Sequence, residues 1–385
     1  MKLKLNSEQK QYEDRFLFYF LSGISGWGAV SILNAYNTLD RLSDILEFSG
    51  KELVDLDFLS DSQRKALINE KRNVDIKLKE YDYLLKSEIK YITYPDSEYP
   101  ERLRNIPQPP AILFVKGELP DDNCHTVGII GSRAATNYGI SSAEYMAEVL
   151  ADAGIGIISG LARGIDGAAH RGALNSLTGN TYAVLGGGVN IIYPKESEDI
   201  YKKITENNRG GIISEMLPGT NAVSQNFPMR NRILSGLSDV IIVIEAREQS
   251  GSLITVDIAL EQGKDIMAVP GRITDPMSKG CNRLINNGAR MANSPEDVLE
   301  LLNIKPVKKD DVRKKMHFTL AKNEKIVYST LDSAPKHLEE IVFQTGLPLS
   351  EVIGILLELE LKGMAVQISS DYYGLSVRNT GMGID

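Results

Sequence analysis

The sequence has few cysteines and histidines, and it lacks any long hydrophobic run. Only Cys124 and Cys281 occur in 385 residues, and the four histidines form no pair with metal-ligand spacing. This argues against a disulfide framework and a structural metal. No segment approaches the ~18 consecutive apolar residues of a membrane span, and the N-terminal segment is too polar for a secretory signal. We therefore expect a cytoplasmic protein with no cofactor and no membrane partner.

Positive charge is scarce as well. The chain has 43 lysines and arginines against 51 aspartates and glutamates, a formal net charge of −8. This balance argues against a protein coated in positive charge for binding duplex DNA. It allows a local basic groove on an acidic body, so any nucleic-acid interpretation must rest on named basic residues.

Three motifs of nucleotide sites and hydrolases are missing. The first strand of the central region ends in GSRAAT, without the G-x-G-x-x-G spacing of a dinucleotide site, and the second ends in SGLARG, without an acid for the ribose. The chain has no G-x-x-x-x-G-K-[ST] phosphate loop and no G-x-S-x-G nucleophile elbow. NAD-dependent oxidoreductases, P-loop ATPases and α/β-hydrolases are therefore disfavoured.

What the sequence does contain is a regular alternation of short strands and helices from residue 126 to about 303. The strand candidates are VGII, GIGIIS, TYAVLG, GIISE, DVIIVIEA and DIMAVPG, which are apolar like strands covered on both faces. Parallel strands with helical crossovers predict an α/β fold with a doubly wound, Rossmann-like sheet. Helices are expected around Met146 and over residues 166–174, 198–207, 230–237, 252–262 and 295–302.

Further regions flank this centre. Residues 1–85 predict a small helical domain. The proline-rich segment that follows predicts edge strands, so the extended Rossmann domain is expected over residues 86–303. Residues 304–318 are basic and predict a linker. Residues 319–385 predict three helices and a β-hairpin, the winged-helix order. Because its third helix carries three glutamates, we expect this module to contact protein or itself rather than duplex DNA.

Loops rich in glycine, serine and basic residues follow the predicted strands. Gly131, Ser132 and Arg133 precede a helix, whose backbone N–H groups and dipole favour an anion. The arginine adds a charged fork that suits phosphate. A second turn begins at Gly160 and carries Arg163 between glycines, which let another chain approach closely. Both turns are predicted to bind phosphate at one edge of the sheet.

Two arginines lie close together on a later helix. On a helix Arg230 and Arg232 diverge by roughly 200°, so at most one of them can face a ligand beside Asn231. The other could pair with an acid such as Glu215 or Glu245.

Further polar residues lie at other predicted strand ends. Lys195 stands just ahead of a helix and can reach the same edge, and Ser250 and Gly251 stand at another helix start after a strand. Asp166 is expected to be the N-cap of its helix rather than a catalytic acid. We expect His170, one turn on, to be a packing residue rather than a catalyst.

These motifs together resemble those of the DNA processing protein A family, also called DprA or Smf. The resemblance rests on GSR (131–133), SGLARGID (159–166), YPK (193–195), ISE (213–215), FPMRNRILSGLS (227–238), EAREQSGSLIT (245–255), VPG (269–271) and KGCNRLINNGA (279–289). It covers the whole central domain. It also implies that the N-terminal region is similar to a sterile-alpha-motif (SAM)-like domain, and the C-terminal region to a winged helix.

The resemblance implies a non-catalytic protein that binds single-stranded DNA during natural transformation. Such a protein shields the strand and helps to load the recombinase RecA onto it. The resemblance places Arg133 and Lys195 where the family's main strand contacts lie. It also implies a homodimer formed through the Rossmann domain, which lets strand-bound units join into larger assemblies.

A nucleotide-processing enzyme is the alternative. Rossmann proteins that cleave N-glycosidic bonds of nucleotides carry a P-G-G-x-G-T-x-x-E loop at a comparable edge. Here the chain reads QSGSLITVDIALE, with serines in place of the paired glycines, and no acid–base pair completes such a site. For strand binding, Tyr138, Tyr193 and Phe227 are candidate base-stacking residues, though each could equally belong to the core.

Overall fold

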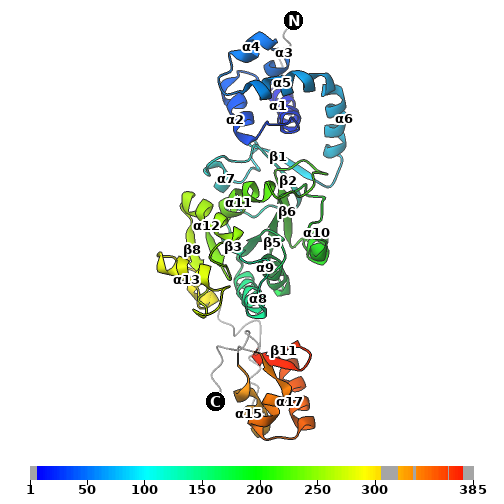
Figure 1. Ribbon diagram of the computed structural model, residues 1–385. Coiled ribbons are helices and arrows are strands. Elements are labelled where there is room, and N and C mark those ends of the chain that lie inside the picture. The colour runs from blue at the N-terminus through cyan, green and yellow to red at the C-terminus, as the bar shows by residue number, and fades with distance from the viewer. Residues whose placement is uncertain (1–6, 305–319, 333–334, 363, 376–385) are drawn as a thin grey trace.

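The centre of the chain is a mixed nine-stranded sheet. The computed structural model describes residues 7–304, 320–332, 335–362 and 364–375. The order of the sheet is β1-β2-β6-β5-β4-β3-β7-β8-β9. Of these strands, Figure 1 labels β1, β2, β6, β5, β3 and β8. In this sheet, strands β3 to β9 are parallel, whereas β2 is antiparallel to both β1 and β6. The strands are β1 Lys90–Thr93, β2 Ile112–Gly117, β3 Thr126–Ile130, β4 Gly156–Ser159, β5 Thr181–Val184, β6 Gly210–Ser214, β7 Val240–Val243, β8 Asp265–Ala268 and β9 Arg290–Met291.

The six strands predicted for the central region all form, and their order confirms the doubly wound fold. β3 to β7 are buried along their whole length, which explains why they are apolar throughout. The sequence pattern does not predict β9, whose two residues are both exposed. It also does not predict the helix α13, in which only Gly280 and Cys281 are buried.

Helices cover both faces of this sheet. α8, α9 and α14 pack on one face, against side chains such as Ile157 and Ile242. α11 and α12 pack on the other face, against Ile158 and Ile241. Neighbouring residues of one strand thus enter different cores, as the alternation of side chains along a strand requires. The helices are α8 Asn137–Asp152, α9 Ile165–Asn175, α10 Glu198–Glu206, α11 Asn226–Leu237, α12 Gly251–Glu261, α13 Lys279–Asn286 and α14 Pro295–Leu301.

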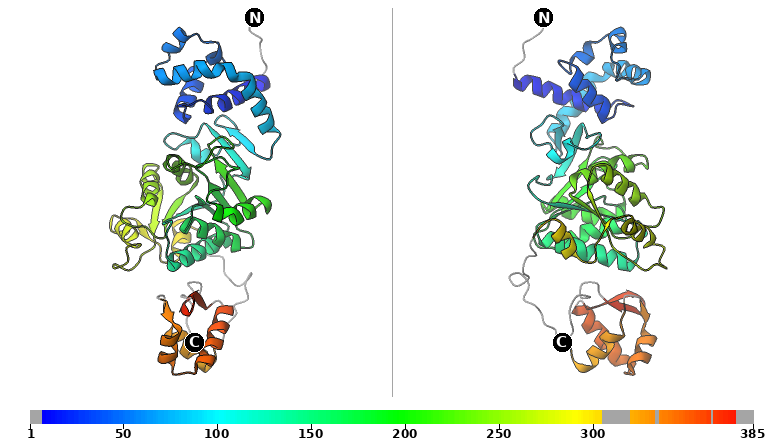
Figure 2. Two further views of the ribbon diagram at one scale, coloured as in Figure 1. Left: turned by 45° about the vertical axis from the view of Figure 1, so that its right-hand side comes forward. Right: turned by 90° about the vertical axis from the view of Figure 1, so that its left-hand side faces the viewer.

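The N-terminal region is helical, as predicted, and lies at the β1–β2 end of the sheet (Figure 2). Its buried aromatic side chains include Phe18, Phe20 and Tyr81, and the same core continues into the sheet through Tyr91 and Phe114. Its likeness to a SAM-like domain and its boundary at residue 85 stay predictions. The helices are α1 Ser7–Ser22, α2 Ala29–Thr38, α3 Asp44–Glu47, α4 Gly50–Val54, α5 Asp61–Glu70 and α6 Val74–Leu85.

The C-terminal region has the predicted winged-helix order. Helices α15 Lys322–Thr330, α16 Leu338–Thr345 and α17 Leu349–Leu361 precede the hairpin of β11 Ala365–Ser369 and β12 Tyr372–Leu375, to which β10 Lys336–His337 adds a third strand. The predicted linker lies outside the described residues, apart from Ile304. In the described part of the chain no single helix is long and apolar enough to cross a membrane. α16 and α17 meet that test only as a pair, with a 109° bend between them.

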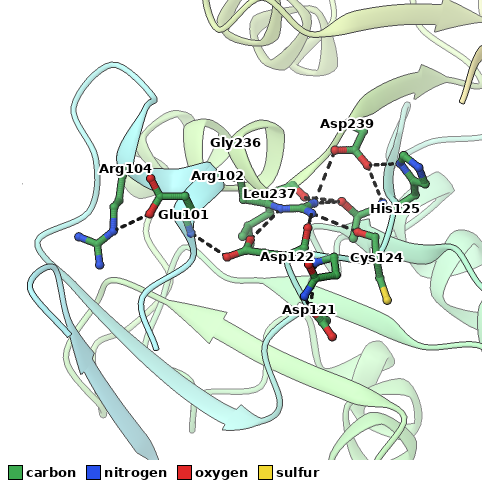
Figure 3. Close-up of polar contacts among 12 residues, drawn as sticks. Glu101, Arg102, Arg104, Asp121, Asp122, Cys124, His125, Gly236, Leu237 and Asp239 are labelled. Carbon is green, nitrogen blue, oxygen red and sulfur yellow. Dashed lines mark hydrogen bonds and ion pairs between the residues drawn. The ribbon is translucent and has the colours of Figure 1, made fainter. Parts of the chain in front are cut away.

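A largely buried arginine holds the amino edge of the sheet together (Figure 3). Arg102, from the short helix α7 (Glu101–Arg104), donates from Nη1 to the Leu237 carbonyl at 2.9 Å and to Thr126 Oγ1. Its Nη2 donates to the carbonyls of Asp122 and Cys124, both at 3.1 Å. The side chain is only 13% exposed. One guanidinium therefore fixes the start of β3 to the end of α11.

We predict that Arg102→Lys lowers the free energy of unfolding by about 1.5–3 kcal/mol, the range for hydrogen bonds to a charged group. An ammonium keeps the charge but cannot reach all of these carbonyls with one planar fork. Urea unfolding followed by circular dichroism measures the change. A variant as stable as the wild type would show that the arginine contributes little to holding the sheet.

Candidate nucleic-acid interface

The strand order reverses at β3, with β4, β5 and β6 on one side and β7, β8 and β9 on the other. In open α/β sheets the crevice beyond the carboxyl ends at such a reversal is the usual ligand site. Two glycine turns meet there. A Cβ on Gly164, which has φ 74°, would lie 2.3 Å from the Ser132 carbonyl oxygen. A Cβ on Gly131 would lie 2.6 Å from Ile165. Only glycines allow the two loops to pack this closely.

The residue before α8 is hydrogen-bonded to an acidic side chain, which the sequence pattern does not predict. The buried carboxylate of Glu245 accepts hydrogen bonds from the Thr136 backbone N–H at 2.9 Å and from the Thr136 hydroxyl. The Ser132 N–H donates to the Glu245 carbonyl at 2.8 Å. The negative charge of Glu245 makes this helix N-terminus less favourable for an anion than the sequence pattern suggests, and the positive charge of Arg133 opposes that effect. An anion contact at the start of α8 stays a prediction.

Arg133 is exposed, and its guanidinium lies over the ring of Phe227, with 5.0 Å from Cζ to the ring centroid. The Phe227 ring also stacks on Tyr193, with centroids 6.1 Å apart and planes 24° apart. Tyr193 is 51% exposed, whereas Phe227 is half-buried and backs onto Gly186, where a Cβ would lie 2.9 Å from the ring. Loops after β3 and β5 and the start of α11 thus form one cluster of a cation and two rings, which we call the Arg133 platform.

Lys195 extends this platform. It follows Tyr193 by two residues and is exposed. Arg163, on the loop after β4, pairs with Glu196 at 2.6 Å, and both side chains are more than half exposed. Exposed pairs of this kind are weak and exchange readily for other partners, so Arg163 remains available to a phosphate.

The two arginines of α11 are both turned into the domain. Arg232 pairs with Glu215, and their side chains are only 11% and 10% exposed, which confirms the predicted acid partner. Burial raises the pKa of Glu215, and Arg232 acts in the opposite direction. Arg230 is 6% exposed, and its Nη1 donates to the carbonyls of Gly160, at 2.8 Å, and Val184. This placement corrects the expectation that one of the two arginines faces the ligand.

The other predicted site residues, Asn231, Ser250 and Gly251, differ in their exposure and in their hydrogen-bond partners. Asn231 is half-buried and accepts a hydrogen bond from Arg230 Nε at 3.2 Å. Ser250 caps α12, and its hydroxyl lies 2.7 Å from that of Ser252. Gly251 is exposed, with open space beside it. A strand contact at the start of α12 stays a prediction.

Asp166 and His170 are internal. Asp166 is the second residue of α9, whose N-cap is Gly164, so the N-cap prediction is wrong. Its carboxylate instead accepts from the Gly160 N–H at 3.2 Å. His170 is fully buried with Nδ1 2.7 Å from the Thr181 hydroxyl, as expected of a packing residue. Burial, helped by the charge of Arg230, lowers the pKa of His170 to about 3. The imidazole is therefore neutral at physiological pH.

Sequence reasoning left the two rings of the platform undecided between core and surface. Aromatic residues in glycine-rich loops have no periodicity that could separate the two, and only the tertiary fold exposes Tyr193 beside Phe227. Tyr138, the third candidate, is 42% exposed on α8. Within the described residues no group of three or more histidine, cysteine, aspartate or glutamate side chains could hold a metal ion.

Comparison with known proteins places this fold in one family. The family model for DNA recombination-mediator protein A matches residues 90–303, and that for the DprA winged helix domain matches residues 317–369. Protein Smf of Escherichia coli (strain K12) is 36% identical over 286 residues, covering 73% of this chain and 76% of that protein. The DNA processing protein DprA of Bacillus subtilis (strain 168) is 40% identical over 215 residues, covering 56% and 71%.

A solved structure agrees with these matches. The X-ray structure of DNA processing protein A from Streptococcus pneumoniae has a TM-score of 0.63 and 32% identity, covering 74% of this chain and 97% of that one. The matched residues 90–303 include every loop of the candidate interface. The chain therefore belongs to the DNA recombination-mediator protein A family, the family of the DprA and Smf proteins.

Proposed function

We propose that this protein binds single-stranded DNA at the Arg133 platform and acts as a recombination mediator. The observation that carries the proposal is the stack of Arg133, Phe227 and Tyr193 at the reversal of the strand order, with the exposed Lys195 two residues after Tyr193. Proteins that bind single strands combine cations that follow the phosphates with rings on which bases stack. The platform offers both groups on loops that the sheet holds in place.

Charge and accessibility favour a single strand over a duplex. Unpaired bases expose their faces to aromatic side chains, whereas a duplex hides them. The formal net charge of −8 also repels a long duplex, but a short stretch of strand needs only the local cations of the platform.

The alternative, an enzyme that cleaves nucleotide N-glycosidic bonds, has less support. Such chemistry needs a carboxylate or another acid–base group within reach of the substrate. Near the platform, Asp166 and Glu245 are buried and already accept hydrogen bonds, His170 is fully buried, and the exposed Glu196 is paired with Arg163. We therefore infer a binding protein without catalysis.

We further propose that the protein shields strands taken up in natural transformation and loads RecA onto them. It would act as a homodimer that joins into larger assemblies, in the cytoplasm, where recombination takes place. The family's description as a recombination mediator supports this role. Stimulation of RecA-driven strand exchange measures the loading step, and a purified protein that leaves the exchange rate unchanged would argue against it.

We predict that Arg133→Glu weakens binding of a fluorescent oligothymidine by about 10- to 150-fold. This is the equivalent of the ~1.5–3 kcal/mol that one hydrogen bond to a charged group contributes. Fluorescence anisotropy measures the affinity. The matched control is Lys90→Glu, an equal charge reversal at an exposed site on β1. Equal affinity of Arg133→Glu and the control would remove the platform from the site.

We predict that Tyr193→Leu removes much of the preference for intact over abasic oligonucleotides. Stacking of a base on an aromatic side chain is worth about 1–3 kcal/mol, and a leucine keeps apolar bulk without a ring face. Tyr83→Leu, at a 79% exposed site on α6, serves as the control. If Tyr193→Leu still discriminates like the wild type, bases do not stack on this ring.

We predict that deletion of residues 319–385 changes the affinity for oligothymidine less than twofold. The outer side of α17 carries the exposed acids Glu351 and Glu358 and the exposed apolar residues Ile353 and Leu357, which do not suit phosphate. The same anisotropy titration tests this. A loss of affinity comparable to that of Arg133→Glu would mean that the winged helix binds the strand.

A further inference from the structure

A buried cation lies directly beneath the platform. The guanidinium of Arg230 is 6% exposed and donates to the carbonyls of Gly160 and Val184. Gly160 follows the last residue of β4, and Val184 is the last residue of β5. The loop after β4 carries Arg163, and the loop after β5 carries the ring of Tyr193. The Arg230 side chain therefore connects the points where these two loops leave their strands, and both loops belong to the candidate interface.

The surroundings of Arg230 are built to hold a charge. Burial lowers the pKa of Arg230 to about 10 and the Asp166 carboxylate opposes this, so the guanidinium remains protonated at neutral pH. The carboxylate of Asp166 also accepts from the Gly160 N–H. A Cβ on Gly160 would lie 2.5 Å from both terminal nitrogens of Arg230 and 2.6 Å from the Asp166 carboxylate. Any larger residue than glycine would displace the cation from this position.

The same helix connects Arg230 to the platform itself. Phe227 precedes Arg230 by three residues, so the two lie about one turn apart on the same side of α11. The Phe227 ring rests against Gly186, between Arg133 and Tyr193. Because both residues are on α11, the bonds of Arg230 to the strand ends also fix the position of the Phe227 ring in the platform.

We propose that Arg230, held by the carbonyls of Gly160 and Val184, is a positioning residue for strand binding: it contacts no nucleotide but aligns the loops and the Phe227 ring that do. This rests on the proposed function. The role differs from that of Arg133, which is exposed and contributes its charge directly. It also explains an arginine at this place, since its terminal nitrogen lies one bond further from the backbone than that of a lysine, and its Nε also donates to Asn231.

The salt dependence of affinity separates positioning from direct contact. For single strands, each phosphate contact that is lost lowers the slope of log affinity against log salt by about 0.7. Arg230→Lys keeps the charge, but its terminal nitrogen lies one bond closer to the backbone and it lacks the Nε bond to Asn231, so we expect it to lose the bridge. We expect its affinity for oligothymidine to fall about tenfold to a hundredfold, the cost of small misplacements in a preorganised site, with an unchanged slope. Arg133→Ala, the reference for a direct contact, lowers the slope.

Hydrogen exchange without DNA provides a readout that does not depend on binding. In Arg230→Lys we expect faster amide exchange over residues 161–164 and 186–193. Arg102→Lys is the matched control, because it removes a similar set of carbonyl contacts at the opposite edge of the sheet. It should lower stability while leaving oligothymidine affinity and exchange in these two loops unchanged.

These measurements distinguish a positioning role of Arg230 from a direct contact with the strand and from no role in binding. Wild-type affinity and exchange in Arg230→Lys, or a slope reduced as in Arg133→Ala, would overturn the positioning role. If Arg230→Lys does not fold, Gly160→Ala is the second variant, because it displaces the guanidinium without changing any charge. Loss of affinity for oligothymidine with the wild-type slope in Gly160→Ala supports the proposal. Full affinity in that variant overturns it. If the wild type itself does not bind single strands, the proposed function fails, while hydrogen exchange still reports whether Arg230 holds the loops.

Discussion

The buried guanidinium of Arg230 is the constraint on which the arrangement of the carboxyl edge depends. An isolated charge inside a protein is costly, and it persists only where partners surround it. Here the partners are two carbonyls at the strand ends and one carboxylate from the following helix. The glycine at position 160 follows from this arrangement, because no side chain fits beside the guanidinium. The loops that carry the exposed cations are thereby fixed before any ligand arrives.

The number of basic residues in the chain is a poor guide to its binding surface. Arg102, Arg230 and Arg232 are largely buried and bond to backbone carbonyls, to acidic side chains or to both. The cations left at the candidate interface are Arg133 and Lys195, with the partly neutralised Arg163 beside them. An acidic protein can therefore bind a polyanion locally, since screening confines each exposed charge to about 8 Å at physiological salt.

Much of the fold could be predicted because the strands are buried on both faces and therefore read as short apolar runs. The pairing of Arg232 with an acid was also predictable, since two arginines two residues apart on a helix cannot face the same way. The position of Arg230 was not predictable, because its partners are backbone carbonyls, which leave no trace in the sequence. The bond between Glu245 and Thr136, the N-cap of α8, was missed for a related reason: the two residues are 109 positions apart in the sequence.

Competition between a single strand and a duplex at rising salt tests the central claim most directly. Oligothymidine and a duplex of the same length would compete for the full-length protein, with affinities taken from about 50 mM to 200 mM salt. A platform of cations and rings predicts at least about tenfold tighter binding of the single strand at every salt concentration, and weaker binding of both as salt rises. Equal or tighter binding of the duplex would contradict it.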